Sequence, residues 1–261
     1  MEKKKNSANV LRREIIIDKH FEGPTNITQG GYISGLMAQH LETDTVEVTM
    51  RNPTSMGKPL ILDTSMSDRV LLYDGDKLLN EAIPGELELD IPEPISLEEA
   101  KKASLKHVIE MPFPNCFGCG SGRSEDEGLH LRSGPVEGRN MVAVDWVPLA
   151  KAVGAKEGET VPEPIAWASM ECPIAKVMEL RGMKNPDETA LLGRMTTKVN
   201  ALPKVGEQCF FMGWPIGRSG RKMELGGTMH NERGEVLMMT KLLFITLKEG
   251  FSFDSFGKDK D

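Results

Sequence analysis

Two segments of this 261-residue chain repeat one order of elements: a stretch with helical spacing, then several stretches with the alternation of β-strands. In the first segment, Ile33, Leu36 and Met37 recur at the spacing of one helix face, which predicts a helix over residues 31–41. In the second segment, a helix is predicted over residues 164–180. A run of strands behind a single helix is typical of the α+β class, because a parallel sheet would alternate strands with helices.

The predicted strands follow each helix closely. Val46, Val48 and Met50 alternate with polar residues, which is the pattern of a half-buried strand. Asp74-Gly75 predicts a tight hairpin turn, since glycine accepts the positive φ that such turns need. The other strands are predicted over residues 13–18, 60–67, 70–73, 78–87, 140–147, 190–201, 207–214, 222–230 and 236–247. A curved antiparallel sheet that covers one long helix is the hot-dog fold, and we expect it twice.

A proline-rich break at residues 91–94 separates the two segments. Ser96 and Glu99 then have the spacing of a capping box, which predicts a linking helix over residues 97–105. We therefore predict two tandem hot-dog domains, each a long central helix wrapped by a curved antiparallel sheet. The first would cover residues 1–107, including the linking helix, and the second would cover residues 108–261.

Charge and hydrophobic pattern exclude several classes of function. A formal net charge of −7 disfavours nucleic-acid binding, because an acidic surface repels phosphate. The chain contains no run of about 18 apolar residues, so no membrane span is predicted. Residues 1–13 include basic residues but lack the apolar stretch of a secretory signal. We therefore expect a cytoplasmic protein whose four cysteines are reduced. The 16 methionines fit either ordinary core packing or a cavity for a lipid-like ligand.

Three stretches of the chain resemble the thioesterase superfamily with the hot-dog fold. In residues 20–38 the pair Gly30-Gly31 opens the predicted helix; the other two stretches are the motif Asn115-Cys-Phe-Gly-Cys-Gly and residues 162–173. The resemblance extends over residues 10–248. It implies hydrolysis of an acyl-CoA or acyl-carrier thioester, with the coenzyme A thioester as substrate and no cofactor.

In thioesterases of the phenylacetate-pathway type, the catalytic carboxylate lies on the central helix, seven residues after the second glycine of the pair. Counted from Gly31, this position is Ala38 in the first half. In the second half, Pro164 stands in place of the glycine and the position is Glu171. The resemblance thus implies one composite site, with Glu171 from the second half and Gly30 and Gly31 from the first.

The predicted roles follow from the chemistry of thioester hydrolysis. Glu171 would be the general base for a water or a nucleophile, and its apolar sequence neighbours should raise its pKa. The first amides of a helix have no intrahelical partner, so Gly30 and Gly31, and Gly31 above all, would stabilise the oxyanion. Pro173 should disturb the predicted helix near Ser169, because proline removes a backbone hydrogen bond.

Neutral and basic side chains complete the predicted site. Gln29 and Asn26, together with Thr28, would orient water or the thioester carbonyl, although hydrogen bonding within the loop is the simpler explanation for them. Coenzyme A carries phosphates, so a basic surface is expected near the site. The candidates for it are Arg194, Lys198, Arg221 and Lys222. Ordinary solvated charge is the competing explanation for these four residues.

Cys116-x-x-Cys119 invites a zinc site that His130 or Cys172 would complete. The chain has no second Cys-x-x-Cys pair, and a structural zinc site needs four clear ligands. The sequence therefore favours a tight turn at this motif and no metal site.

Two alternatives to hydrolysis stay open. A hot-dog hydratase or dehydratase would need a histidine with an acid, but the helix entry has no His-Gly-Gly and His20 lies far upstream. A non-catalytic binder of acyl-CoA or a fatty acyl ligand fits as well, because one half lacks the acid and the other lacks the glycine pair. The superfamily usually works as dimers, and the sequence leaves monomer and homodimer both open.

Overall fold

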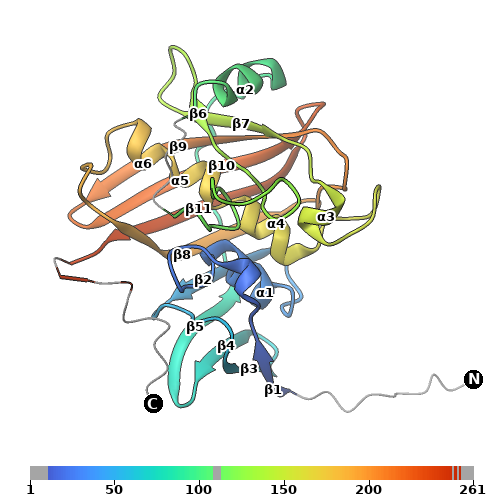
Figure 1. Ribbon diagram of the computed structural model, residues 1–261, viewed down its shortest axis with the longest axis vertical. Coiled ribbons are helices and arrows are strands. Elements are labelled where there is room, and N and C mark those ends of the chain that lie inside the picture. The colour runs from blue at the N-terminus through green and yellow to red at the C-terminus, as the bar shows by residue number, and fades with distance from the viewer. Residues whose placement is uncertain (1–10, 108–112, 249, 252, 254–261) are drawn as a thin grey trace, which may run out of the picture.

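The computed structural model describes residues 11–107, 113–248, 250, 251 and 253, so most of the basic stretch 1–13 lies outside the described residues. The described strands form one antiparallel sheet of 11 strands in the order β1-β3-β4-β5-β2-β8-β11-β10-β9-β7-β6 (Figure 1). The strands are β1 (Arg12–Ile16), β2 (Thr45–Met50), β3 (Pro59–Met66), β4 (Arg69–Asp74), β5 (Lys77–Pro84), β6 (Gly134–Pro135), β7 (Val142–Trp146), β8 (Ala190–Val199), β9 (Cys209–Ser219), β10 (Lys222–Asn231) and β11 (Val236–Thr246).

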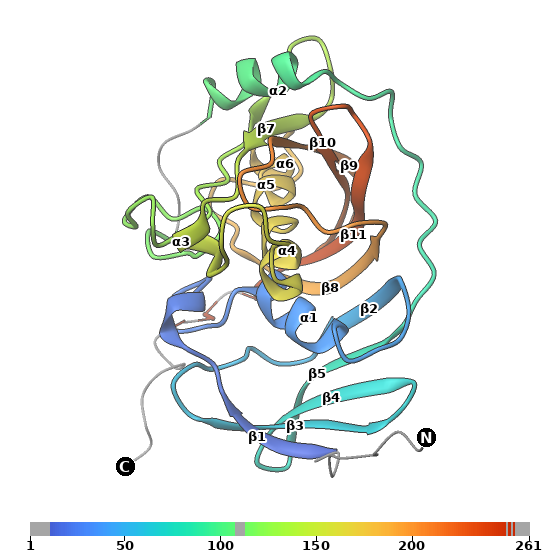
Figure 2. The same ribbon diagram turned by 90° about the vertical axis from the view of Figure 1, so that its right-hand side faces the viewer.

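The sheet divides at one seam into strands from the two halves of the sequence. Strands β1 to β5 form one side and β6 to β11 form the other, and β2 pairs with β8 between them. At this seam Thr45 is opposite Lys198, and Thr49 is opposite Arg194. The predicted hairpin at Asp74-Gly75 is confirmed, with Gly75 at φ 57°. Figure 2 shows the sheet curving around the helices.

Six α-helices and one 3-10 turn accompany the sheet in the described residues. The elements are η1 (Lys19–Phe21), α1 (Gly30–Ala38), α2 (Leu97–Ser104), α3 (Ala150–Val153), α4 (Glu163–Ser169), α5 (Cys172–Ala175) and α6 (Val177–Leu180). The predicted capping box of α2 is present, since the Ser96 hydroxyl accepts from the Glu99 amide and the Glu99 carboxylate accepts from the Ser96 amide. This helix packs on the second half of the sheet, where Ala100 and Ala103 contact a cluster around Phe210.

The prediction of one continuous helix over residues 164–180 is wrong. The structure has three short helices there, α4, α5 and α6, with the break at Met170 and Glu171. Pro173 explains the break, because it has no N–H to donate and, in a continuous helix, its ring would clash with the carbonyl of Ser169. The first helix is also shorter than predicted, ending at Ala38. None of the helices among the described residues has the length and apolar character needed to cross a membrane.

Helices α1 and α4 cross at close range, and glycine makes the crossing possible. A Cβ added at Gly35 would lie 2.7 Å from the Pro164 Cα and 2.7 Å from the Trp167 Cβ. Carbon atoms in proteins pack at about 3.5–4.0 Å, so no other residue fits without moving the helices apart. The crossing joins the first half of the chain to the second at the point where the candidate site begins.

Gly35→Ala should therefore destabilise the protein by about 1–3 kcal/mol, as overpacking typically does. The clash has to outweigh the gain of roughly 0.5–1 kcal/mol that alanine brings to a helix interior. Urea unfolding of the two proteins measures the difference. Gly217→Ala is the matched control, since a Cβ at this exposed position meets nothing within 4 Å and should change the unfolding free energy by less than about 0.5 kcal/mol. Equal stability of the Gly35 variant and the wild type would contradict the close crossing.

Candidate functional site

Glu171 and Gly31, which are 140 positions apart, form a direct hydrogen bond. The Gly31 N–H donates to the Glu171 carboxylate at 2.6 Å. Gly31 is the second residue of α1, where the backbone amides have no partner within the helix and carry the positive end of its dipole. Glu171 occupies the break between α4 and α5 and is only 9% exposed. The two groups that the sequence placed in one composite site therefore meet in the structure.

Burial has a strong effect on the Glu171 carboxyl. Its pKa is raised to about 8, chiefly by loss of solvent; the Gly31 amide lowers the pKa, the neighbouring Cys116 raises it, and the Gly30 amide lowers it. The expected rise of the Glu171 pKa thus occurs, and a carboxyl with such a pKa is typical of acid–base sites.

Gln29 connects the start of α1 to the end of α4. Its side-chain oxygen accepts from the Tyr32 amide at 2.6 Å and caps the helix. Its side-chain nitrogen donates to the Ala168 carbonyl at 3.1 Å and lies 3.8 Å from the Cys172 Sγ. Gln29 is fully buried, so its hydrogen bonds hold the two helix ends in register. Thr28 is buried beside it, and its hydroxyl has no hydrogen-bond partner among the described residues.

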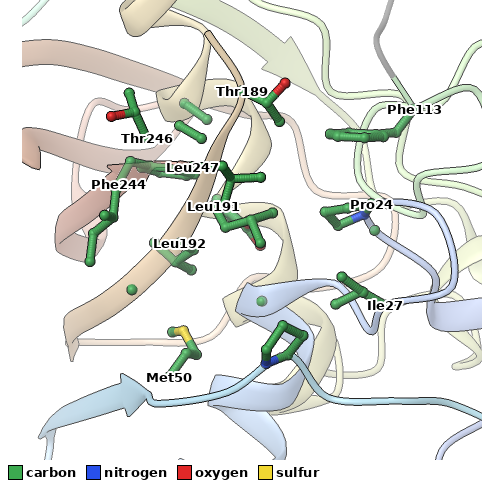
Figure 3. A pocket seen from close by; sticks show the side chains of 18 of the residues that line it. Pro24, Ile27, Met50, Phe113, Thr189, Leu191, Leu192, Phe244, Thr246 and Leu247 are labelled. Atoms are coloured by element: carbon green, nitrogen blue, oxygen red, sulfur yellow. The ribbon is translucent and has the colours of Figure 1, made fainter. Parts of the chain in front are cut away.

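A cavity of about 560 Å³ opens next to Glu171 and is lined by residues from both halves of the chain. Ile27 comes from the first half, and Leu191 and Phe244 come from the second (Figure 3). Most of its surface is apolar, while Glu171 and Gln29 bring polar groups to it. Its size is within the range of about 300–1,000 Å³ that small-molecule sites have.

Asn26 does not join this arrangement. It is exposed at a turn with φ 62°, its amide donates to the Glu22 carboxylate at 2.8 Å, and it is not among the residues that line the cavity. Asparagine tolerates positive φ better than most residues, which accounts for its presence in this turn. The predicted role of Asn26 in orienting substrate is therefore corrected to a role in loop geometry.

The predicted basic residues separate into two groups. Arg221 lines the cavity and donates to the Thr246 carbonyl at 3.0 Å. Arg194 pairs with Glu47 at 3.4 Å and Lys198 with Asp44 at 3.7 Å, and neither lines the cavity. Lys222 is exposed at the start of β10, also away from the lining. The prediction that Arg194, Lys198 and Lys222 lie near the site is therefore corrected. Arg194 and Lys198 point outward because of the alternation of side chains along β8, which depends on the strand register.

Four other cations line the cavity and were not predicted from the sequence, namely Arg51, Lys176, Lys184 and Lys248. Lys176 is almost fully buried and forms an ion pair with Glu179 three residues later. Lys184 donates to the Glu188 carbonyl at 2.7 Å. The i, i+3 spacing of Lys176 and Glu179 could have predicted their ion pair. Nothing in the sequence indicates that the pair lies at the cavity.

Three thiols lie beside Glu171. The Sγ atoms of Cys116, Cys119 and Cys172 are all within 4.8 Å of one another, and Cys116 and Cys172 are 3.6 Å apart. The same three residues line the cavity. His130, the other ligand considered from the sequence, is bound instead to the Ser124 carbonyl and to Arg132.

Comparison with solved structures identifies the architecture as a hot-dog fold. A tesB protein of Mycobacterium avium subspecies paratuberculosis covers 93% of this chain and 96% of its own, with a TM-score of 0.59 and 16% identity. A conserved hot-dog protein of unknown function from Alicyclobacillus acidocaldarius covers 93% and 95%, with a TM-score of 0.61 and 9% identity. The acyl-CoA thioesterase II TesB2 of Mycobacterium marinum covers 94% and 97%, with a TM-score of 0.55 and 7% identity. No family model and no curated protein matches the sequence.

Proposed function

We propose that this protein hydrolyses an acyl thioester at a site shared by the two halves of the chain. The observation that carries the proposal is the hydrogen bond between Glu171 and the Gly31 amide beside a largely apolar cavity. Two of the solved structures with the same fold are named for thioesterases, tesB and acyl-CoA thioesterase II, which supports this reaction class. A coenzyme A thioester, with its acyl chain in the cavity, is the substrate we infer.

We further infer that the two halves are tandem hot-dog units that meet at β2 and β8, with the boundary near residues 107 and 108. Only one of the two equivalent sites would then be complete. The first half supplies Gly30 and Gly31 and has the buried Ala38 at the position of the acid. The second half supplies Glu171. Both contributions meet at a single place, next to the cavity.

In the proposed reaction, Glu171 takes a proton from a water molecule as the water oxygen attacks the thioester carbonyl carbon. The carbon–sulfur bond then breaks, the carboxylic acid is released, and Glu171 returns its proton to the leaving sulfur, which departs as the thiol. Since the Gly31 amide already donates to Glu171, its first role would be to hold the carboxylate in place. A thioester oxygen that approaches the helix start would compete for this donor, which makes Gly31 less free as an oxyanion donor than the sequence suggested.

A non-catalytic binder of acyl-CoA or a fatty acyl ligand is the second candidate. The Gly31 amide favours this candidate, because it already donates to Glu171, whereas in an oxyanion hole the N–H would be free to donate to the substrate oxygen. A hydratase or dehydratase has less support. Among the described residues that line the cavity there is no histidine, and the ring of His20 packs against Phe21 and Phe117.

Turnover of a panel of acyl-CoA thioesters, followed by release of free thiol, tests the proposal. Release that depends on the protein and varies with acyl chain length would support it. Thermal stabilisation by acyl-CoA without any thiol release would favour the binder. If no member of the panel is hydrolysed and none stabilises the protein, both candidates fail.

Arg221→Ala should raise the KM for a coenzyme A thioester roughly fivefold, equivalent to about 1 kcal/mol for one partly exposed charge contact. Arg221 is the predicted phosphate-binding residue that lines the cavity. An acyl thioester of N-acetylcysteamine, which has no phosphate, should show no such rise. Arg194→Ala is the matched control, because Arg194 pairs with Glu47 outside the cavity lining. An unchanged KM for the coenzyme A thioester would show that Arg221 does not bind the phosphates of coenzyme A.

A further inference from the structure

The three thiols beside the cavity come from two distant segments. Cys116 and Cys119 lie in the loop that precedes β6, and Cys172 begins α5 after the break at Glu171. Their Sγ atoms are mutually within 4.8 Å, with 3.6 Å between Cys116 and Cys172. The cysteines are free, and a disulfide would need its sulfurs at about 2.0 Å. Neither the proposed hydrolysis nor the packing of the halves accounts for three converging sulfurs.

The separation of the sulfurs suits a single metal ion. Zinc binds thiolates at about 2.3 Å in tetrahedral geometry, which places two sulfur ligands about 3.8 Å apart. The Cys116–Cys172 distance of 3.6 Å is close to this value. A cluster of several irons would hold its thiolates farther apart, because each would bind a different iron atom. Soft thiolate ligands in this arrangement select zinc over the hard cations magnesium and calcium.

The loop around Cys116 has the backbone shape that such a site needs. A Cβ at Gly118 would lie 2.5 Å from the Cys172 Sγ, so only glycine lets the loop close on the third sulfur. The Gly120 amide donates to the Cys116 carbonyl at 2.8 Å and closes the turn that the sequence predicted.

We propose that Cys116, Cys119 and Cys172 bind one zinc ion as three thiolate ligands, with the fourth coordination position open to the cavity. Three protein ligands and one open position are the arrangement of catalytic zinc sites, whereas structural sites are closed by a fourth residue. All three cysteines line the cavity together with Glu171. The open position would accept water or an oxygen or sulfur atom of a molecule in the cavity. This site stands independently of thioester hydrolysis.

Metal analysis and zinc titration of the reduced full-length chain test the proposal. We expect one zinc per chain, held against a competing chelator. Cys116→Ser and Cys172→Ser should weaken zinc binding more than about 100-fold, beyond the effect of a lost outer-shell partner. Cys209→Ser is the matched control, because Cys209 is buried in β9 outside the cluster and should leave the affinity unchanged. Equal affinity in the Cys172 variant and the wild type, or no zinc binding by the reduced wild type, would overturn the proposal.

Cobalt(II) provides a second measurement that needs no variant. Cobalt added to the reduced wild-type protein should give the intense visible absorption of a tetrahedral site and the near-ultraviolet charge-transfer band of thiolate ligation. A spectrum without the charge-transfer band overturns the site, even where a cysteine variant does not fold. Glu171→Gln should bind zinc with wild-type stoichiometry. If the Glu171→Gln variant loses hydrolysis but still binds zinc, the metal site and the proposed hydrolysis can be tested separately.

Discussion

Replacing Glu171 by glutamine is expected to lower thioester turnover by about 100- to 10,000-fold, the usual contribution of a general acid–base group. Glutamine has nearly the same shape, and its side-chain oxygen can still accept the hydrogen bond from the Gly31 amide. It cannot take a proton from water, so the fold and the binding of substrate should survive while the chemical step fails. The initial rate of thiol release at saturating acyl-CoA measures the effect.

Glu163→Gln is the control for this experiment. Glu163 begins α4 a few residues before Glu171, is half-buried, and likewise has its carboxyl pKa raised by burial. It does not line the cavity, so its replacement should leave turnover unchanged. A Glu171→Gln protein that is folded and as active as the wild type would end the proposed mechanism. Acyl-CoA binding by both proteins without turnover in either would instead support the binder.

Trp167→Ala is expected to destabilise the protein by about 3–5 kcal/mol, the typical cost of removing a buried tryptophan side chain. Trp167 is 1% exposed and has the largest side chain among the fully buried residues that the structure describes. Its Cβ and Cγ lie against Gly35, so α4 rests on α1 through this residue. The space left by alanine cannot be filled by the neighbouring glycine, which has no side chain. Urea unfolding followed by far-ultraviolet circular dichroism measures the change in free energy.

The same substitution should also disturb the site. The Trp167 carbonyl and the Ala168 Cα pack directly against Gly31, whose amide holds Glu171. Turnover should therefore fall together with stability. Trp167→Phe, which keeps most of the buried surface, should cost clearly less in both measurements. A loss of less than about 1 kcal/mol in the alanine variant would contradict the picture of α1 and α4 as one packed unit.

Local sequence patterns predicted the elements well wherever neighbours in the sequence decide the structure. The alternation of Val46, Val48 and Met50 matches β2, the Asp74-Gly75 hairpin is present, and the Ser96–Glu99 capping box begins α2. These features depend on side-chain periodicity and on glycine or capping chemistry, which act over a few residues. The same logic indicated that Pro173 would disturb its helix, although the predicted helix ran through it.

Long-range placement could not be obtained from such patterns. Pro173 interrupts the helix, and this break leaves Glu171 at a joint beside the Gly31 amide and Cys172 beside Cys116. The outward position of Arg194 and the exposed turn of Asn26 were likewise invisible in the sequence. Strand register and loop path decide them, because moving a strand by one residue turns every side chain to the other face.

The sequence by itself determined the α+β class, the main strands, the paired glycines at a helix start and a candidate acid, because each is encoded within a short window of residues. Only the tertiary structure decided that the two halves share one sheet, that Glu171 meets Gly31, and that three cysteines converge at the cavity. The contacts between distant segments join residues between 53 and 153 positions apart. They exist because the apolar faces of α1 and α4 are buried against each other inside one curved sheet, a packing event that no local pattern records.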